Sequence, residues 1–343
     1  MSERGLRVGV IGAGAWGRIH LDVIRRRPDA VVAAVCDIDG DVAARAAEQS
    51  GGVPPYTDHE AMLDGEPLDA VTIVTPEHAH HAPTVAAARR GVHVLCEKPM
   101  APTVADCEEM IAAAQASGVT LMVDFHNRWN PPYALLKERY ATGKLGRAIY
   151  GHVKHSDSKV VPQKMVAWAS ATSILWFVGC HCVDLLRWVL DEEVVRVYGR
   201  VLSGTLRSGG VDADDAYLSM LEFEGGSVFM MENAWCLPDA EPHFLDPRLD
   251  LVGSEGSAYI SVIKNQAMQV FTEDAGYETP DLLVAPEVHG RMRGYATESI
   301  DHFLDCVRDG VRPMVDGVDG LQATRVIRAI LDSIEQDAPV TLA

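Results

Sequence analysis

The stretch LRVGVIGAGAWG, residues 6–17, determines the architecture of the first third of this 343-residue chain. Residues 6–11 form an apolar run of the kind that makes a buried strand, and a glycine string with the spacing GxGxxG follows at once. A helical pattern then continues through Ile24. A strand, a glycine-rich turn and a helix in this order are typical of the unit that opens a parallel sheet.

Each glycine of this string has its own physical reason. Gly12 permits the tight turn, Gly14 lets the backbone approach a pyrophosphate, and Gly17 lets the helix pack closely on the strand. The helix N-terminus presents unpaired N–H groups to the phosphates. The next strand, 31–36, ends at Asp37, where a carboxylate can bind ribose hydroxyls and would repel a 2′-phosphate. The pattern predicts a dinucleotide site that prefers NAD to NADP.

Strands and helices continue to alternate as far as residue 125. We expect strands at 70–75, 92–98 and 120–125, and helices at 41–48, 82–90 and 105–117. Alternation of this kind predicts βαβ units with right-handed crossovers. The fold class is therefore α/β, with a doubly wound parallel sheet of the Rossmann type over residues 1–125.

The stretch VHVLCEKPM, residues 92–100, places chemistry at the end of one of these strands. The apolar run stops at Glu97-Lys98-Pro99, because proline cannot donate to a sheet ladder. A buried core needs neither a carboxylate nor an ammonium at this point. Ligands of open α/β sheets bind at the carboxyl ends of the strands, which makes Lys98 a candidate functional residue. On this stretch alone, a surface Lys–Glu pair at a turn is an equal alternative.

A second strand end, TPEHAHH at residues 75–81, is expected at the same sheet edge. Its three histidines, at 78, 80 and 81, suggest metal binding at first sight. Their spacing does not put two of them on one helix face beside a carboxylate or thiolate, and Pro76 marks a loop. We therefore predict no metal site, and expect Thr75, Pro76 and His80 to lie beside the nicotinamide.

The composition narrows the class of protein. Lys and Arg number 30 against 49 Asp and Glu, a net charge of −19, which argues against nucleic acid and anionic membranes as partners. The seven cysteines are scattered through apolar runs, as expected for reduced thiols. We find no signal-peptide pattern and no apolar run of about 18 residues, the length that a membrane span needs. These features predict a cytoplasmic protein.

In residues 126–343 the regular alternation of strands and helices stops. Several strand patterns are joined by turns such as Gly225-Gly226, which predicts an α+β domain with a large, mainly antiparallel sheet. A helix is expected at 172–190, and its helical spacing puts His181 and Asp184 on one face between Phe177 and Trp188. Such a face suits the wall of a pocket. From the residues alone, a core histidine beside a carboxylate is an equal alternative.

These motifs together resemble the glucose–fructose oxidoreductase/inositol dehydrogenase family (Gfo/Idh/MocA), over essentially the whole chain. The matching segments are GAGAWG (12–17), TPEHAH (75–80), GVHVLCEKPMA (91–101), FHNRWNPPY (125–133), GCHCVDLLRW (179–188), LVGSEG (251–256) and DGVDG (316–320). The resemblance implies an NAD(P)-dependent oxidoreductase acting on sugars, cyclitols such as inositol, or related diols. It also implies a homodimer or homotetramer that packs through the C-terminal sheet. We divide the chain into domains at 1–125 and 126–343, with the option that the C-terminal helices pack back on the first domain.

The resemblance assigns roles to three residues. Lys98 matches the EKP lysine, expected to hydrogen-bond the reacting hydroxyl, and His181 matches the histidine expected to be the general acid/base. Asp184 matches the aspartate expected to orient that histidine or hold substrate hydroxyls. Inositol dehydrogenase-like members have an aspartate four residues before the histidine, where this chain has Phe177. Whether His181 or Lys98 takes the proton therefore stays open.

The predicted site residues form two sets. Residues expected to bind the cofactor are Gly12, Gly14, Ala15, Trp16, Gly17, Asp37, Thr75, Pro76, His80, Glu97 and Lys98. Residues expected on the substrate side are Lys98, Arg128, Trp129, His155, Trp168, His181 and Asp184. Two other functions are compatible with this pattern: an enzyme that retains NAD as an internal redox agent, as in glycoside cleavage, and a non-catalytic NAD-sensing protein.

Overall fold

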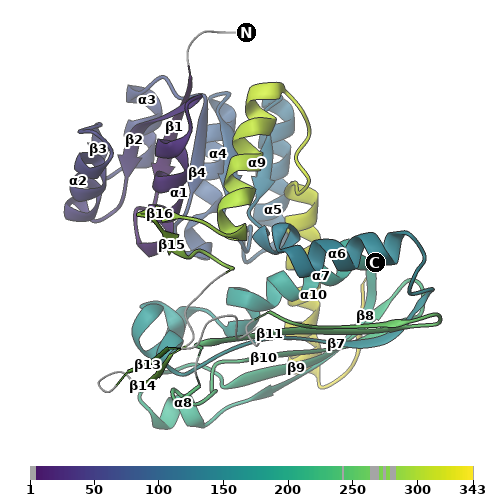
Figure 1. Cartoon of the computed structure of the whole chain (residues 1–343). Helices are drawn as coiled ribbons and strands as arrows, with labels where there is room; N and C mark the ends of the chain where they lie inside the picture. Colours follow the sequence, from purple (N-terminus) through teal and green to yellow (C-terminus); the bar gives the residue numbers. More distant parts are fainter. Residues whose placement is uncertain (1–4, 242, 263–269, 273–275, 279–282, 343) are drawn as a thin grey trace. The chain divides into compact units, whose positions relative to one another are not determined.

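The computed structural model describes the whole chain except residues 1–4, 242, 263–269, 273–275, 279–282 and 343 (Figure 1). It divides into two compact units. The first comprises Met1–Trp129 and Leu283–Thr324, and the second Asn130–Leu282 and Arg325–Ala343.

Unit 1 is built on a six-stranded sheet with the order β3-β2-β1-β4-β5-β6, in which every pair is parallel. Its strands are β1 (Leu6–Ile11), β2 (Ala30–Cys36), β3 (Pro55–Tyr56), β4 (Ala70–Ile73), β5 (His93–Cys96) and β6 (Leu121–Val123). The chain moves outward from β1 in one direction to β2 and in the other to β4, so the strand order reverses beside β1. This is the point where doubly wound sheets bind their ligands. The predicted Rossmann-type sheet is confirmed.

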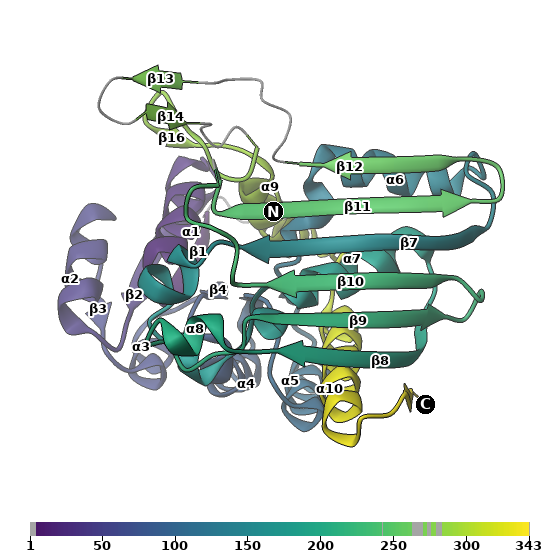
Figure 2. The same ribbon diagram turned by 90° about the horizontal axis from the view of Figure 1, so that it is seen from below.

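Helices cover both faces of this sheet (Figures 1 and 2). They are α1 (Ala15–Arg26), α2 (Gly40–Gln49), α3 (His59–Gly65), α4 (His81–Arg89), α5 (Val104–Ser117) and α9 (Tyr295–Asp309), with short 3-10 turns η1 (Glu77–Ala79) and η2 (His126–Trp129). Helix α1 contacts α9, and α4 contacts α5. Strand β3 and helix α3 are not predicted by the sequence pattern, since one has two residues and the other only seven.

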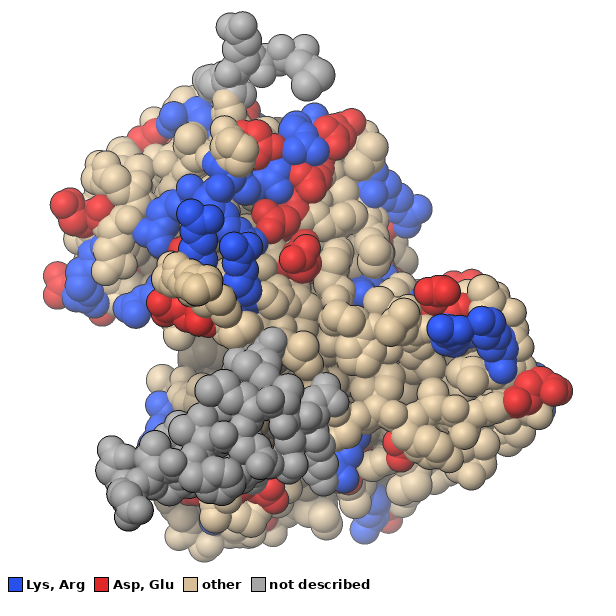
Figure 3. Space-filling view, in the orientation of Figure 1, with Lys and Arg blue, Asp and Glu red and all other residues tan. Residues whose placement is uncertain are grey.

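Ion pairs hold α9 against α1. Arg26 binds Asp301 at 2.6 Å, Arg27 binds Asp305 at 2.6 Å, and Arg308 at the end of α9 binds Asp29 at 2.7 Å. Figure 3 shows Lys and Arg side chains gathered over α1, with acidic side chains beside them toward α9. The segment 283–324 thus returns to the first unit, an option that the sequence left open for the C-terminal helices.

Unit 2 contains a seven-stranded sheet with the order β12-β11-β7-β10-β9-β8-β17. Only β7 and β10 pair in parallel, so the expected mainly antiparallel sheet is confirmed. Its strands are β7 (Ala148–Asp157), β8 (Val194–Leu202), β9 (Ala216–Phe223), β10 (Val228–Ala234), β11 (Leu245–Gly253), β12 (Ser257–Ser261) and β17 (Val340–Thr341). Gly226, with φ +82°, lies in the turn between β9 and β10, as predicted.

The remaining elements are mostly helical. They are α6 (Pro131–Ala141), α7 (Cys180–Leu190), α8 (Thr205–Ser208), the 3-10 turn η4 (Ala169–Ala171), the π-helical turns η3 (Val161–Met165) and η5 (Leu175–Gly179), and α10 (Gly317–Gln336), which runs from unit 1 into unit 2. Two antiparallel strand pairs are β13 (Val270–Thr272) with β14 (Gly276–Glu278) and β15 (Glu287–Val288) with β16 (Arg291–Met292). All of these strands except β13 lie in residues 273–294, which the sequence pattern predicts as a surface or interface loop and which fall partly outside the described residues. No helix of the described chain is long and apolar enough to cross a membrane.

Three local differences from the sequence prediction concern the surroundings of the site. Helix α6 begins at Pro131, whereas the sequence pattern predicts a break at Pro131-Pro132 and a helix from about Tyr133; proline fits the first helical positions. Strand β7 extends to Asp157, beyond the strand at 148–154 that the sequence pattern predicts, so His155 belongs to a strand and not to the loop expected after Lys154. The helix predicted at 172–190 is a π-helical turn, η5, followed by α7, which changes the helical phase just before His181.

Candidate active site

The glycine-rich loop after β1 has the geometry that a dinucleotide needs. Gly12 has φ +94°, and a Cβ at this position would overlap the carbonyl oxygen of Val74. A Cβ on Gly17 would overlap the carbonyl oxygen of Gly12, whereas a Cβ on Gly14 would have no atom within 4 Å. Gly14 caps α1 without a side-chain hydrogen bond. The N-terminus of α1 thus faces open space, with N–H groups available to an anion.

Asp37 follows β2 and lies next to this loop. Its Oδ2 accepts a hydrogen bond from the backbone N–H of Ala13 at 2.8 Å, and its Oδ1 accepts one from Asp39 at 3.0 Å. The side chain is half-buried, and the following residue, Ile38, is 94% exposed. The carboxylate is therefore fixed beside the glycine loop and keeps lone pairs for a further donor.

His80 joins two strand ends of unit 1. Its Nδ1 lies 2.9 Å from the carbonyl oxygen of Pro99, and its Nε2 lies 2.8 Å from that of Thr75. Burial lowers the pKa of His80, and the hydrogen bonds to these carbonyls oppose that shift. The ring thus ties the loop after β4 to the turn after β5. It holds the loop in place, and its predicted contact with a cofactor stays a prediction.

The carboxylate of Glu97 connects α1 to the turn after β5. Its Oε1 accepts a hydrogen bond from the indole Nε1 of Trp16 at 2.7 Å and lies 3.3 Å from Nε2 of His20. Its Oε2 accepts the backbone N–H of Lys98 at 3.1 Å. Burial opposes ionisation of Glu97, but the hydrogen bond from His20 and the nearby Lys98 charge outweigh it and lower the pKa to about 2. Glu97 is therefore a buried carboxylate held by several donors.

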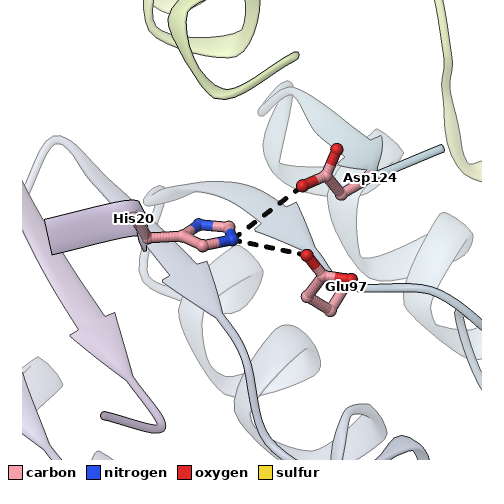
Figure 4. A group of neighbouring side chains, drawn as sticks. All are labelled: His20, Glu97 and Asp124. Carbon is pink, nitrogen blue, oxygen red and sulfur yellow. Dashed lines mark hydrogen bonds and ion pairs between the residues drawn. The ribbon is translucent and has the colours of Figure 1, made fainter. Parts of the chain in front are cut away.

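Two further residues at this place were missed by the sequence analysis. Asp124, fully buried, lies where β6 ends, and its Oδ2 is 3.9 Å from Nε2 of His20 (Figure 4). The ring of His126 lies 5.5 Å from that of Trp16, and burial lowers the pKa of His126 to about 4. The signal for Asp124 was present: a charged residue inside an expected buried strand, 120–125.

Lys98 stands immediately beyond this cluster. It is half-buried, and β5, which precedes it, is central enough that Val94, Leu95 and Cys96 are fully buried. After the strand, the backbone N–H of Glu97 still donates a hydrogen bond to the carbonyl oxygen of Ile73 in β4, at 2.9 Å. The ammonium thus follows the carboxyl end of an inner strand of the sheet, as the sequence predicted.

Arg128 and Trp129 have contacts of a structural kind within unit 1. The guanidinium of Arg128 binds the carbonyl of Met314 at 2.9 Å and the carboxylate of Asp319 at 2.9 Å. The ring of Trp129 lies 5.2 Å from that of His302 on α9. Their predicted substrate-side roles stay predictions.

In unit 2, His181 and Asp184 lie on α7, three residues apart and therefore on one side of the helix. Both are buried, with 3% and 1% of their surfaces exposed. The ring of His181 stacks on that of His155 from β7, with centroids 6.1 Å apart and planes inclined by 25°. The carbonyl of His155 accepts a hydrogen bond from Asn233 at 3.0 Å, which fixes this part of β7 to β10. The structure thus brings together three of the predicted substrate-side residues.

Phe177 lies in the π-helical turn before α7. Its ring is 5.8 Å from that of Trp235, whose Nε1 donates to Oδ2 of Asp157 at 3.1 Å. Phe177 therefore packs on an aromatic residue and does not replace the missing aspartate chemically. Trp168, before η4, is half-exposed, and its predicted role is likewise a prediction.

Comparison with known proteins identifies both parts of the chain. Residues 6–125 match the Gfo/Idh/MocA model described as an oxidoreductase family with an NAD-binding Rossmann fold, and residues 137–342 match the C-terminal alpha/beta domain of the same family.

Curated relatives and solved structures agree with this match. An inositol 2-dehydrogenase of Saccharopolyspora erythraea is 36% identical, over 94% of this chain and 90% of its own. The NAD⁺-dependent scyllo-inositol 2-dehydrogenase of Bacillus subtilis is 26% identical, over 99% of this chain and 97% of its own. The crystal structure of a myo-inositol 2-dehydrogenase from Lactobacillus plantarum superposes with a TM-score of 0.85 at 21% identity, covering 99% of this chain and 100% of that one. The chain therefore belongs to the Gfo/Idh/MocA family of oxidoreductases with an NAD-binding Rossmann domain.

Proposed function

We propose that this protein is an NAD-dependent dehydrogenase that oxidises a secondary hydroxyl of a cyclitol or sugar, and reduces the corresponding ketone in reverse. One observation carries the proposal. The glycine loop, Asp37 and Lys98 follow β1, β2 and β5, which are parallel and therefore end at the same edge of the sheet, and the strand order reverses beside β1.

The residues at this edge fit NAD. The pyrophosphate would lie over Gly14, where there is open space, and against the N-terminus of α1. Asp37 would bind the adenosine ribose hydroxyls and repel a 2′-phosphate. Toward the nicotinamide end, Thr75 has a buried Oγ1 that finds no hydrogen-bond partner among the described residues, as expected of a group that awaits a ligand.

The chemistry follows from the residue types. Bound nicotinamide supplies the hydride acceptor for oxidation of the alcohol. The ammonium of Lys98 would stabilise the negative charge that develops on the substrate oxygen. The imidazole of His181 would accept the hydroxyl proton, since histidine can act as acid or base near neutral pH. Asp184, on the same side of α7, would orient His181 or hold a neighbouring hydroxyl.

The substrate class rests on the relatives. Curated relatives include inositol 2-dehydrogenases and a D-apiose dehydrogenase, all of which carry names of polyol or sugar substrates. We assign the same class to this chain, with cyclitols first. The experiment is a screen of purified protein with NAD or NADP against inositols, aldoses and aldonates, followed at the NADH absorbance band. NADH formation with a cyclitol supports the proposal, and the absence of NADH formation with any inositol, aldose or aldonate contradicts it.

We further propose that the protein forms a homodimer or homotetramer through the sheet of unit 2. Strands of this sheet carry exposed apolar side chains: Tyr150, Met230 and Tyr259 are 57%, 57% and 70% exposed. Met230 lies directly opposite Met220, which is also exposed, so two apolar side chains adjoin on neighbouring strands β9 and β10. Exposed apolar patches of this kind mark interaction surfaces. Light scattering should give a mass above the 37.2 kDa of one chain, and Met230→Glu should lower it. Met165→Glu, an exposed methionine outside the strands, is the control.

A further inference from the structure

The buried cluster of His20, Glu97 and Asp124 presents an electrostatic problem (Figure 4). Their exposed fractions are 0%, 5% and 0%, and one atom from each lies within 4.8 Å of the others. Two ionised carboxylates this close and this deep repel each other and lose their hydration. Some cation, either a proton or a metal ion, must offset one of the two charges.

The hydrogen bonds differ sharply between the two carboxylates. Glu97 accepts hydrogen bonds from the indole Nε1 of Trp16 at 2.7 Å and from the backbone N–H of Lys98 at 3.1 Å, and it lies 3.3 Å from Nε2 of His20. Neither side-chain oxygen of Asp124 has a hydrogen bond of normal geometry within the described structure. A carboxylate with several donors favours the ionised form, and a buried one without donors favours the neutral form. The geometry therefore separates the two acids.

The imidazole of His20 does not remove the problem. Its Nε2 faces both carboxylates, and its buried Nδ1 has no partner in the described part of the chain. A second N–H at Nδ1 would be buried without an acceptor, which costs free energy. The tautomer with hydrogen on Nε2 alone satisfies the ring. This tautomer donates to Oε1 of Glu97, 3.3 Å away.

We propose that Asp124 is a neutral, protonated acid and a positioning residue, which holds the Glu97 carboxylate in place beside Lys98. The O–H of Asp124 donates to the Glu97 carboxylate, and Glu97 in turn orients Trp16 of the glycine loop and the backbone of Lys98. The expected effect of Asp124 on catalysis rests on the proposed function of Lys98. The proposed protonation state of Asp124 is independent of that function.

The groups that face Asp124 support this assignment. They are His20 from α1, Glu97 and Lys98 after β5, and His126, whose Nδ1 lies 3.9 Å from Oδ1 of Asp124. Burial raises the pKa of Asp124 well above its usual range, the Glu97 charge acts in the same direction, and Ser299 of α9 and the Lys98 charge act against it. Burial also keeps His126 neutral near pH 7, since its pKa falls to about 4.

The direct test is the infrared carbonyl band of a protonated carboxyl group. The difference spectrum between wild type and Asp124→Asn at pH 7 should contain this band, and it should disappear on alkaline titration. The matched control is Asp215→Asn. Asp215 is buried too, but it accepts the backbone N–H groups of Thr205 and Leu206 at 2.8 and 2.7 Å and should give a carboxylate band. Lys98→Ala should keep the Asp124 band, so failure of the proposed catalytic role would leave this result intact.

The positioning role has its own readout. An amide can donate to Glu97 as a protonated acid can, so Asp124→Asn should keep NAD affinity and turnover, whereas Asp124→Ala should lose both. Wild-type kcat/KM should fall at alkaline pH by about tenfold per pH unit once Asp124 ionises, and Asp124→Asn should lack this fall. If the Asn variant does not fold, wild type with ¹³C-labelled aspartate decides the point.

Two results would overturn the proposal. One is a difference spectrum at pH 7 with a carboxylate band in place of the protonated one. The other is elemental analysis showing one equivalent of a divalent metal in the wild type and none in Asp124→Asn, because a metal ion would then hold the place of the proton.

Discussion

The indole Nε1 of Trp16 donates a hydrogen bond to Oε1 of Glu97 at 2.7 Å, across 81 positions of sequence. This contact joins the glycine-rich loop after β1 to the turn that carries Lys98 after β5. The loop expected to hold the pyrophosphate and the turn expected to act on the substrate are thus parts of one hydrogen-bonded unit. A substitution at either end should affect both cofactor binding and catalysis.

The three glycines of the loop should respond differently to alanine. Gly14→Ala should fold normally, because its φ of −64° and the open space around it accept a Cβ, yet it should lose NAD affinity by about tenfold or more where the methyl displaces a phosphate. Gly12→Ala should instead destabilise the fold by on the order of 2 kcal/mol, since its Cβ meets backbone atoms. Thermal melts and NAD titrations separate the two effects. Equal NAD affinity in Gly14→Ala and wild type would contradict the assigned pyrophosphate position.

Asp37 should set the preference for NAD. Asp37→Asn keeps a side-chain oxygen for the N–H of Ala13, bonded at 2.8 Å in the wild type, but removes the charge that repels a 2′-phosphate. NADP affinity relative to NAD should rise by about tenfold or more. Asp41→Asn, on the first turn of α2, is the control and should leave the ratio unchanged. An unchanged ratio in Asp37→Asn would exclude this residue from cofactor selection.

Lys98→Ala should lower kcat by about 10² to 10³ while NAD still binds, because the variant removes a charge at the developing oxyanion but leaves the glycine loop intact. Stopped-flow absorbance gives kcat, and quenching of tryptophan fluorescence gives NAD binding. Lys164→Ala, an exposed lysine of η3, serves as the control. Turnover equal to wild type would remove Lys98 from the mechanism.

His126 should make the protein sensitive to acid. Burial lowers its pKa from 6.5 to about 4, so the unfolded chain binds a proton that the folded chain does not. The stabilisation is fully present above pH 6.5 and is lost as pH falls toward 4, on the order of 3 kcal/mol for this one group. His126→Asn should flatten the pH dependence of the unfolding midpoint across this window, and exposed His78→Asn should not. Parallel curves for wild type and His126→Asn would show that His126 titrates normally in the folded protein.

The sequence predicted the elements whose signals are local and missed those that depend on tertiary contacts. The strands and helices around the glycine loop follow from apolar runs and turn residues, and Asp37 and Lys98 stand at strand ends as expected. The hydrogen bonds and contacts of the buried Glu97 carboxylate were not predicted. The hydrogen bond from Trp16 and the contact with Asp124 join residues that only the folded sheet brings together. The π-helical turn at Leu175–Gly179 was missed for a related reason: a periodicity of 3.6 fits the same apolar residues.

Hydride transfer from a substrate carbon to NAD is tested most directly by following the transferred hydrogen as deuterium. The protein would be incubated with NAD and a ring-deuterated cyclitol that is active in the screen, and the NADH formed would be isolated and weighed by mass spectrometry. Each NADH should carry one deuterium and should form in step with the ketone, and Lys98→Ala should give little NADH. Converted substrate without free deuterated NADH, and with cofactor retained on the protein, would contradict the account and indicate an internal redox cycle instead.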